Sequence, residues 1–278
     1  TPGLLNACMC GEDVIFNIIF ISRYGVAGAA IGTALAQALT AVLMLWRLCV
    51  CSPALKMRRG ESWRPEKEIF VRAVKIGLPM SFEHIALCGA QIASTKIIAP
   101  LGSVAIAANS FAVTAESLCY MPGYGIGTAA TTLVGQSMGA GKKKLAKNFA
   151  DLSVLLGCLV MTACGIVMYF LCPAVFAMLT PDLQVRELGV RVLRIELFAE
   201  PFYAASIVSS GALRGAGDSL IPSILNLISM WGVRLTISVA LVGRIGLPGA
   251  WIAMAVELCV RGILLFVRLQ RGKWLGGK

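Results

Sequence analysis

Charged residues are scarce in this chain of 278 residues: Asp, Glu, Lys and Arg together make up only 14% of it, whereas 58% of the residues are apolar. A soluble protein of this length needs more charge to cover its surface. The composition therefore argues against an ordinary soluble domain and predicts an integral membrane protein. A net charge of +11 also suits a nucleic-acid-binding protein, so the placement of the basic residues has to decide.

Histidine occurs once, as His84, and the ten cysteines form no repeated CxxC pair. Zinc sites and disulfide frameworks need such residues in clusters. Here the cysteines are scattered through apolar stretches, where a thiol packs as a small apolar side chain. We therefore expect no bound metal and no cofactor. The chain also begins without an initiator methionine or the basic region of a signal peptide, and we interpret this as a truncated or processed start.

Long apolar stretches are abundant, and a membrane-spanning helix needs about 20 mostly apolar residues. Eight stretches of suitable length lie at residues 4–22, 26–50, 76–100, 104–137, 149–172, 188–212, 219–242 and 247–269. The fourth is too long for a straight span, so we expect a kink at Pro122-Gly123 and an extension past the bilayer surface. The sequence thus predicts an all-α, polytopic membrane helical bundle with eight transmembrane helices.

Basic residues concentrate in every second connector between these stretches. The rich connectors are the segment 51–75, residues 142–147 and the C-terminal tail, whereas the alternate connectors hold one arginine or none. This asymmetry is typical of the positive-inside rule. We therefore predict a multi-pass protein of the cell (inner) membrane with cytoplasmic basic loops and a cytoplasmic C-terminus. Because topology accounts for the positive charge, the expected partner is the lipid bilayer and not nucleic acid.

An internal repeat links the two ends of the chain. At an offset of 221 residues, the segment 23–31 (RYGVAGAAI) aligns with the segment 244–252 (RIGLPGAWI), with the arginine and both glycines in register. Transporters are commonly built from such repeats, with the substrate site where the repeats meet. We infer that the first two spans are counterparts of the seventh and eighth. On this interpretation, four spans that should precede the first are absent from the chain.

Four segments resemble the multidrug and toxic compound extrusion (MATE) family. They are residues 76–83 (IGLPMSFE), 120–141 (YMPGYGIGTAATTLVGQSMGAG), 211–218 (GALRGAGD) and the turn 231–234 (WGVR). The second segment, with lysines directly after it and the third segment at the right distance, is quite specific. The resemblance covers nearly the whole chain.

This resemblance implies two six-helix lobes that face each other across a central cleft open alternately to either side. It implies a secondary active transporter that exports small organic, often cationic, compounds by H⁺ or Na⁺ antiport. We assign residues 1–50 to the last two helices of a truncated N-lobe, 51–67 to a basic cytoplasmic linker and 68–278 to the six-helix C-lobe. The expected partners are a small-molecule substrate and the missing N-terminal lobe, and transported Na⁺ or H⁺ is the only expected ion.

Glutamates inside apolar stretches are the leading site candidates, because a carboxyl group at membrane depth is costly and usually faces a cavity or a partner. We place Glu83 and Glu116 first and Glu200 after them. Away from water, such a group can exchange a proton near neutral pH or accept a cation. The alternative role is a packed, neutral glutamate bonded to a neighbouring helix. Glu257 has Arg261 four residues on, the favoured order for a helical ion pair.

Tyr203 and His84 are the other polar candidates. Some members of the resembled family carry an acidic residue near the position of Tyr203, whereas here Glu200 lies one turn away, at i+4 from Glu196 on the same face. The phenol is a candidate for the cleft lining. His84 adjoins Glu83 and is either a proton partner or a core histidine.

Three prolines lie within or at the head of the acidic helices, namely Pro79, Pro122 and Pro201. Each removes a backbone hydrogen bond and permits bending. We expect bending at these prolines to change access to the cleft when the glutamates bind a proton or a cation.

Two alternatives stay open on the sequence. A lipid-linked oligosaccharide flippase of the same superfamily needs cationic groups in its cavity to hold a pyrophosphate, and the candidates Arg191, Arg194 and Arg234 all lie near predicted helix ends. A membrane-embedded enzyme needs clustered catalytic groups within the spans, and one histidine with glutamates on separate spans does not supply them. The antiporter ranks first, and we predict that the chain is not an enzyme.

Overall fold

The computed structural model describes residues 2–51 and 66–276, and this part of the chain is helical without any strand. It divides into two compact units, Thr1–Glu66 and Lys67–Lys278, which we describe separately. Most of the basic linker predicted at 51–67 lies outside the described residues. Helices with the length and apolar character of membrane spans occur in both units, which confirms the predicted all-α membrane bundle. Within the described residues there are five of them: Cys8–Trp46, Ser103–Gly139, Lys143–Leu179, Leu220–Ile245 and Leu247–Gly276.

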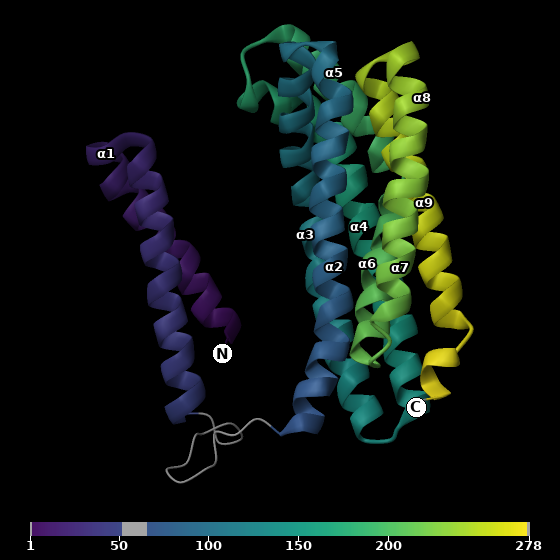
Figure 1. Ribbon diagram of the computed structural model, residues 1–278. Helices are drawn as coiled ribbons and strands as arrows, with labels where there is room; N and C mark the ends of the chain where they lie inside the picture. The colour runs from purple at the N-terminus through teal and green to yellow at the C-terminus, as the bar shows by residue number, and fades with distance from the viewer. Residues whose placement is uncertain (1, 52–65, 277–278) are drawn as a thin grey trace. The chain divides into compact units, whose positions relative to one another are not determined.

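The first unit is a helical hairpin. Its helix α1 (Pro2–Trp46) is followed by the short η1 (Arg47–Cys51), and Gly25 interrupts α1 with φ 57° and ψ −132°. The two arms then run side by side (Figure 1). A Cβ atom on Gly28 would collide with the backbone of Phe20, and one on Gly32 would lie 2.7 Å from Oδ1 of Asn17. The glycines therefore permit both the reversal and the close contact of the arms, and α1 comprises the two predicted spans 4–22 and 26–50.

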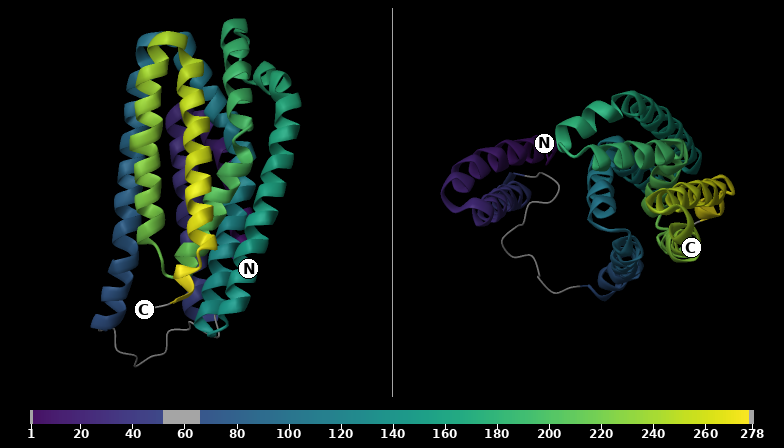
Figure 2. Two further views of the ribbon diagram at one scale, coloured as in Figure 1. Left: turned by 90° about the vertical axis from the view of Figure 1, so that its right-hand side faces the viewer. Right: turned by 90° about the horizontal axis from the view of Figure 1, so that it is seen from above.

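The second unit contains the remaining helices, which run up and down the bundle (Figures 1 and 2). They are α2 (Lys67–Ile98), η2 (Ala99–Leu101), α3 (Ser103–Gly139), α4 (Lys143–Leu179), α5 (Leu183–Leu197), α6 (Glu200–Gly215), α7 (Leu220–Ile228), η3 (Ser229–Leu235), α8 (Thr236–Ile245), α9 (Leu247–Gln270) and η4 (Lys273–Gly276). The predicted stretch 76–100 falls on α2 and η2, but polar residues within it, among them Glu83, His84 and Gln91, leave it less apolar than the other spans.

The turn between α8 and α9 repeats the turn of the first unit. Gly246 has φ 68° and ψ −147°, close to the values at Gly25, and a Cβ on Gly249 would collide with Leu241 as one on Gly28 would with Phe20. All three pairs stand 221 residues apart. The repeat predicted from the sequence is therefore confirmed at the level of backbone conformation.

Two predicted spans are less regular than expected. The stretch 188–212 is not one helix, because a turn at residues 198–199 separates α5 from α6. Pro201 stands in the first turn of α6 and has no N–H to continue the helical bonding from α5. The expectation that Glu196 and Glu200 share one face of a continuous helix is therefore wrong.

The stretch 219–242 is continuous but not uniformly α-helical. The turn predicted at residues 231–234 is instead part of the π-helical segment η3, which joins α7 to α8 without a break. Such segments re-aim side chains and are frequent at functional sites. Arg234 lies in this segment and not near a helix end, which corrects the prediction. The helix α3 likewise continues through Pro122 with helical geometry on both sides, running past it as far as Gly139.

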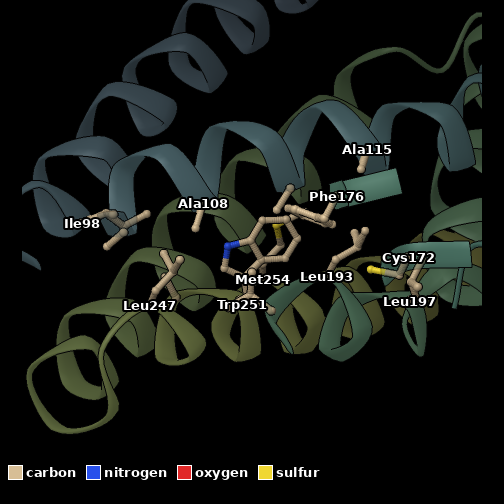
Figure 3. Close-up of a cluster of buried hydrophobic side chains, with 14 of the residues drawn as sticks. Ile98, Ala108, Ala115, Cys172, Phe176, Leu193, Leu197, Leu247, Trp251 and Met254 are labelled. Atoms are coloured by element: carbon tan, nitrogen blue, oxygen red, sulfur yellow. The ribbon is translucent and has the colours of Figure 1, made fainter. Parts of the chain in front are cut away.

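The interior of the second unit consists of two apolar clusters. The larger, shown in Figure 3, packs Trp251 and Met254 of α9 against Ala108 of α3, Phe176 of α4 and Leu193 of α5. In the other, α3 and α6 approach closely at glycines: Thr131 Oγ1 donates a hydrogen bond of 2.8 Å to the carbonyl of Gly211. These contacts fix the helices that carry the polar groups described next.

Candidate transport site

Five glutamates are buried in the second unit, each with at most 4% of its surface exposed. They come from five different helices: Glu83 on α2, Glu116 on α3, Glu196 on α5, Glu200 on α6 and Glu257 on α9. A carboxyl group in such a position must be bonded, paired with a cation or neutralised. The environment of each therefore shows what it can do.

Glu83 lies in a complete bonding network that joins α2 to α6 and α7. The guanidinium Nη2 of Arg214 lies 2.8 Å from each of its carboxylate oxygens. Ser223 Oγ donates a bond of 2.5 Å to Oε2, and Asn226 Nδ2 donates one of 2.6 Å to Oε1. Charge-assisted bonds of this kind are the strong ones. His84 is exposed on the surface of the unit, and the turn of the helix directs it away from this network.

Glu116, Glu196 and Glu200 form a second acidic group, in which the charge of Glu116 repels those of the other two. Both carboxyl oxygens of Glu196 and of Glu200 are buried, and none has a hydrogen-bond partner among the described residues. Gly165 of α4 makes room for Glu200, because a Cβ there would lie 3.3 Å from Glu200 Cγ. Buried carboxyl oxygens without partners are rare in native proteins, and each calls for an explanation.

Two arginines balance part of this negative charge. Arg261 Nε lies 3.1 Å from Oε1 of Glu257, which confirms the ion pair predicted from their spacing. Arg234 and Arg261 both attract Glu116, and Arg234 also attracts Glu257. The guanidinium of Arg261 stands 5.4 Å from the ring centre of Tyr203. Four carboxyl groups thus face two guanidinium groups in this part of the interior.

Tyr203 belongs to a group of three tyrosines beside the acids. Its ring centre lies 5.8 Å from that of Tyr120, which in turn lies 5.6 Å from that of Tyr124. Both pairs meet edge to face, an arrangement that aromatic pairs prefer. The half-buried phenol of Tyr203 therefore lies between the acidic group and the aromatic face of α3.

A small polar cavity adjoins Arg234. It has a volume of about 10 Å³, room for one water molecule, and Ser94, Ser238 and Asn109 are among its lining residues. A neighbouring cavity of about 300 Å³ shares Asn109 and Ile98 with it. Trp251 Nε1 donates a bond of 3.0 Å to Asn109 Oδ1 between them.

The three predicted hinges lie where the sequence placed them along the chain: Pro79 inside α2, Pro122 inside α3 and Pro201 in the first turn of α6. Pro79 stands one turn before Glu83. At Gly123, next to Pro122, the space that a Cβ would need is filled by the thioether of Met161 on α4. Whether the helices bend at these prolines stays a prediction.

The sequence predicted Arg261 as the partner of Glu257 but not the other polar partners of the buried glutamates. It did not foresee Arg214, Ser223 and Asn226 as the partners of Glu83, because the pairs are 131 to 143 residues apart in the chain. An arginine within an apolar stretch was the available signal for Arg234 and Arg261. Within the described residues, no group of three or more His, Cys, Asp or Glu side chains has the geometry to hold a metal ion.

Comparison with known proteins identifies a family whose model matches this chain. The MatE family model matches residues 79–240. A probable multidrug resistance protein NorM of Thermotoga maritima is 29% identical over 266 residues, which cover 94% of this chain and 56% of that protein. Its counterpart in Idiomarina loihiensis is 29% identical over 276 residues, covering 97% and 60%. The chain thus spans a little over half the length of these curated relatives.

Solved structures show the same fold. One, described as an outward-facing multidrug resistance MATE family transporter of the MOP superfamily, superposes with a TM-score of 0.90 at 20% identity. Another, a MOP superfamily transporter from Pyrococcus furiosus whose binding pocket is described as having reverse polarity, gives 0.90 at 19% identity. Each match covers 99% of this chain and 63% of the other.

Proposed function

Because the chain belongs to the MatE family, whose members are transporters, we propose that it forms part of a secondary active exporter of small organic compounds, most of them cationic, driven by H⁺ or Na⁺ antiport. The two-helix unit would complete a first lobe with further helices, and the second unit would be the other lobe. The observation that carries this proposal is the acidic group of Glu116, Glu196 and Glu200, in which the carboxyl oxygens of Glu196 and Glu200 are buried and lack partners among the described residues.

The charge balance of this group supports coupling to a cation. If Glu116, Glu196, Glu200 and Glu257 were all ionised, Arg234 and Arg261 would leave two negative charges uncompensated. Uncompensated charge inside a membrane protein is expensive, so protons or Na⁺ have to make up the difference. A group that gains and loses such an ion as the cleft opens to either side can couple the ion gradient to export. Tyr203 lies beside Arg261, so the gain or loss of an ion by the acidic group would change the electrostatic environment of its ring.

Glu83 would contribute in a different way. A proton or cation arriving at its carboxylate competes with Arg214, and loading would release the connection between α2 and α6. Because Pro79 lies one turn away on the same helix, α2 could then bend. His84 has no direct access to this carboxylate and would act, if at all, from the outer surface of α2.

The flippase alternative is less well supported. It needs several cationic groups around a cavity in the interior of the bundle, where the transported pyrophosphate would have to pass. Arg191 and Arg194 line a surface cavity between α4 and α5, whereas Arg234 lines a different cavity in the interior. The enzyme alternative has no support in a family of transporters.

We propose a cytoplasmic position for the basic end of the second unit. The lysine-rich turn between α3 and α4 lies at the same end of this unit as the C-terminus and the start of α2 (Figure 1). The positive-inside rule then puts that end in the cytoplasm of the cell membrane.

Efflux of a cationic dye from cells that express the full-length protein tests the proposal. An imposed pH or Na⁺ gradient should accelerate efflux by the unmodified protein, because the ion has to be exchanged. Glu200→Gln and Glu116→Gln should remove this acceleration, since an amide takes up no proton near neutral pH and offers no negative charge to a cation. Glu187→Gln, an exposed position on α5, is the matched control and should keep it. Equal efflux with and without either gradient, in the unmodified protein and in both variants, would show that the acidic group does not couple transport.

A further inference from the structure

A surface cavity between α4 and α5 has the charge of an anion site. It has a volume of about 520 Å³ and lies toward the end of the unit opposite the lysine-rich turn (Figure 1). Three arginines and one glutamate line it together with apolar residues: Arg186, Arg191, Arg194, Glu187, Pro173, Leu183 and Val190. The polar wall thus carries a surplus of two positive charges. None of the ion pairs in the described part of the chain involves these four charged residues.

Arg194 is the deepest of these groups and the least satisfied. Its Nη2 donates one long bond of 3.4 Å to the carbonyl of Tyr169, and its guanidinium carbon stands 4.7 Å from the centre of the Tyr169 ring. Its Nε is buried without a hydrogen-bond partner among the described residues. A guanidinium offers five donors in a planar fork that fits the oxygens of a phosphate. Arg194 is also among the residues that line the cavity.

The cavity faces lipid on its apolar sides. The helix α4 is among the five apolar spans, and only 28% of its most apolar window is buried. Large apolar side chains around the cavity are strongly exposed, as at Phe170 (75%), Met178 (88%), Leu183 (63%) and Phe198 (74%). In a bilayer such a surface contacts acyl chains. The occupant of the cavity therefore has both an anionic and an apolar part.

The three arginines all lie on α5 and lean the same way along it. Asp182 caps the start of α5, and Arg194 lies twelve residues further on, about 18 Å along the helix axis. Long side chains of a helix lean toward its N-terminus, which here is the nearer end of the bundle. This lean directs the side chains of Arg186, Arg191 and Arg194 toward the end of the unit where α4 joins α5, and the Arg194 guanidinium lies at Tyr169 of α4.

We propose that this cavity binds an anionic phospholipid. Arg186, Arg191 and Arg194 hold its phosphate, and an acyl chain lies along Pro173 and Val190. A lipid is the fitting occupant because it brings the missing negative charge and covers the apolar wall at once. This site is separate from the acidic group and does not depend on the direction or ion of transport. A bound lipid stabilises the folded protein by mass action and connects α4 to α5.

Thermal unfolding of the full-length protein in phosphatidylcholine nanodiscs tests the site. Replacing part of the phosphatidylcholine by phosphatidylglycerol should raise the unfolding temperature. The double variant Arg191→Gln/Arg194→Gln should lose most of this rise. Arg244→Gln, an exposed arginine at the same end of the unit but outside the cavity, should keep it. Inorganic phosphate added to phosphatidylcholine nanodiscs should have no effect, since it lacks the apolar part.

Three results would contradict the proposed lipid site. They are equal unfolding temperatures of the unmodified protein in both lipids, a full phosphatidylglycerol response in the double variant, and a response to inorganic phosphate as large as that to the lipid. The exposed single variant Arg191→Gln provides a second test if the double variant does not fold, because it removes one phosphate ligand without disturbing a buried group. Its response should be smaller than that of the unmodified protein, and an unchanged response would count against the site.

Discussion

The bond network of Glu83 makes a quantitative prediction about stability. The Glu83 side chain is 6% exposed and that of Arg214 27%, so the pair is largely withdrawn from solvent. Removing one member of a buried pair costs about 3–5 kcal/mol. In Glu83→Gln the amide oxygen can still accept a bond from Ser223 or Asn226, and Arg214 keeps some contact with solvent. We therefore expect this variant to lower the free energy of unfolding by about 2–3 kcal/mol.

A double-mutant cycle with Arg214→Gln isolates the pair itself. Each single variant leaves one charge without its partner, whereas the double variant removes both charges together. The double variant should therefore be more stable than the sum of the single effects predicts, by a coupling of about 2 kcal/mol. The free energies come from unfolding of the detergent-solubilised protein in a denaturing detergent, followed by circular dichroism. Glu187→Gln with Arg244→Gln serves as the control cycle, because both residues are exposed and take part in none of the ion pairs of the described chain.

This prediction would be refuted if the two single substitutions changed the free energy of unfolding additively, to within about 0.5 kcal/mol, as independent sites do. That result would mean that the 2.8 Å contacts of the guanidinium contribute no net energy. Coupling in the control cycle as large as in the test cycle would lead to the same conclusion, since it would reflect a general charge effect.

Three further substitutions probe helix packing and the proposed hinge. Gly215→Ala places a Cβ against the backbone of Thr131, so α3 and α6 have to separate and the free energy of unfolding should fall by about 1–3 kcal/mol. Gly125→Ala, where a Cβ meets nothing within 4 Å, should change it by less than about 0.5 kcal/mol, and equal losses would contradict this packing. Pro122→Ala should lower dye efflux while the amount of protein in the membrane, measured by immunoblot, stays unchanged. Undiminished efflux would exclude Pro122 as a hinge.

Local residue patterns predicted most of the fold. All eight apolar stretches fall on helical segments, because length and hydropathy alone determine whether a helix can cross a bilayer. The repeat was equally readable, since Gly25 and Gly246 are required by the positive φ of the turn. The break at Phe198 was harder to see. Its signal, Pro201, is the same as that of a kinked but continuous helix, as in α3 at Pro122.

Only part of the candidate site was predictable. Burial at membrane depth pointed to Glu83, Glu116 and Glu200 because charge in an apolar stretch is visible in the sequence. The partners of Glu83 depend on tertiary contacts between α2, α6 and α7, which no local pattern encodes. Glu257 was different, because a pair four residues apart on one helix is a local pattern, and its arginine was predicted correctly.

A comparison of the two hairpins related by the repeat shows which residues the hairpin fold requires and which it only tolerates. They share the turn glycines and the close contacts, yet they differ at the charged positions. At the offset of 221 residues, Arg234, Glu257 and Arg261 correspond to Asp13, Ala36 and Thr40. Ala36 and Thr40 are as buried in their hairpin as Glu257 is in its own. A small apolar residue therefore suits this position of the hairpin, and the buried charges are not needed to form it. The first hairpin holds charged groups of its own, since Oε2 of Glu12 and Oδ1 of Asp13 are buried there without a hydrogen-bond partner among the described residues. Because a buried charged pair is costly to hold, we propose that Glu257 and Arg261, which Ala36 and Thr40 replace in the first hairpin, serve ion exchange and not stability.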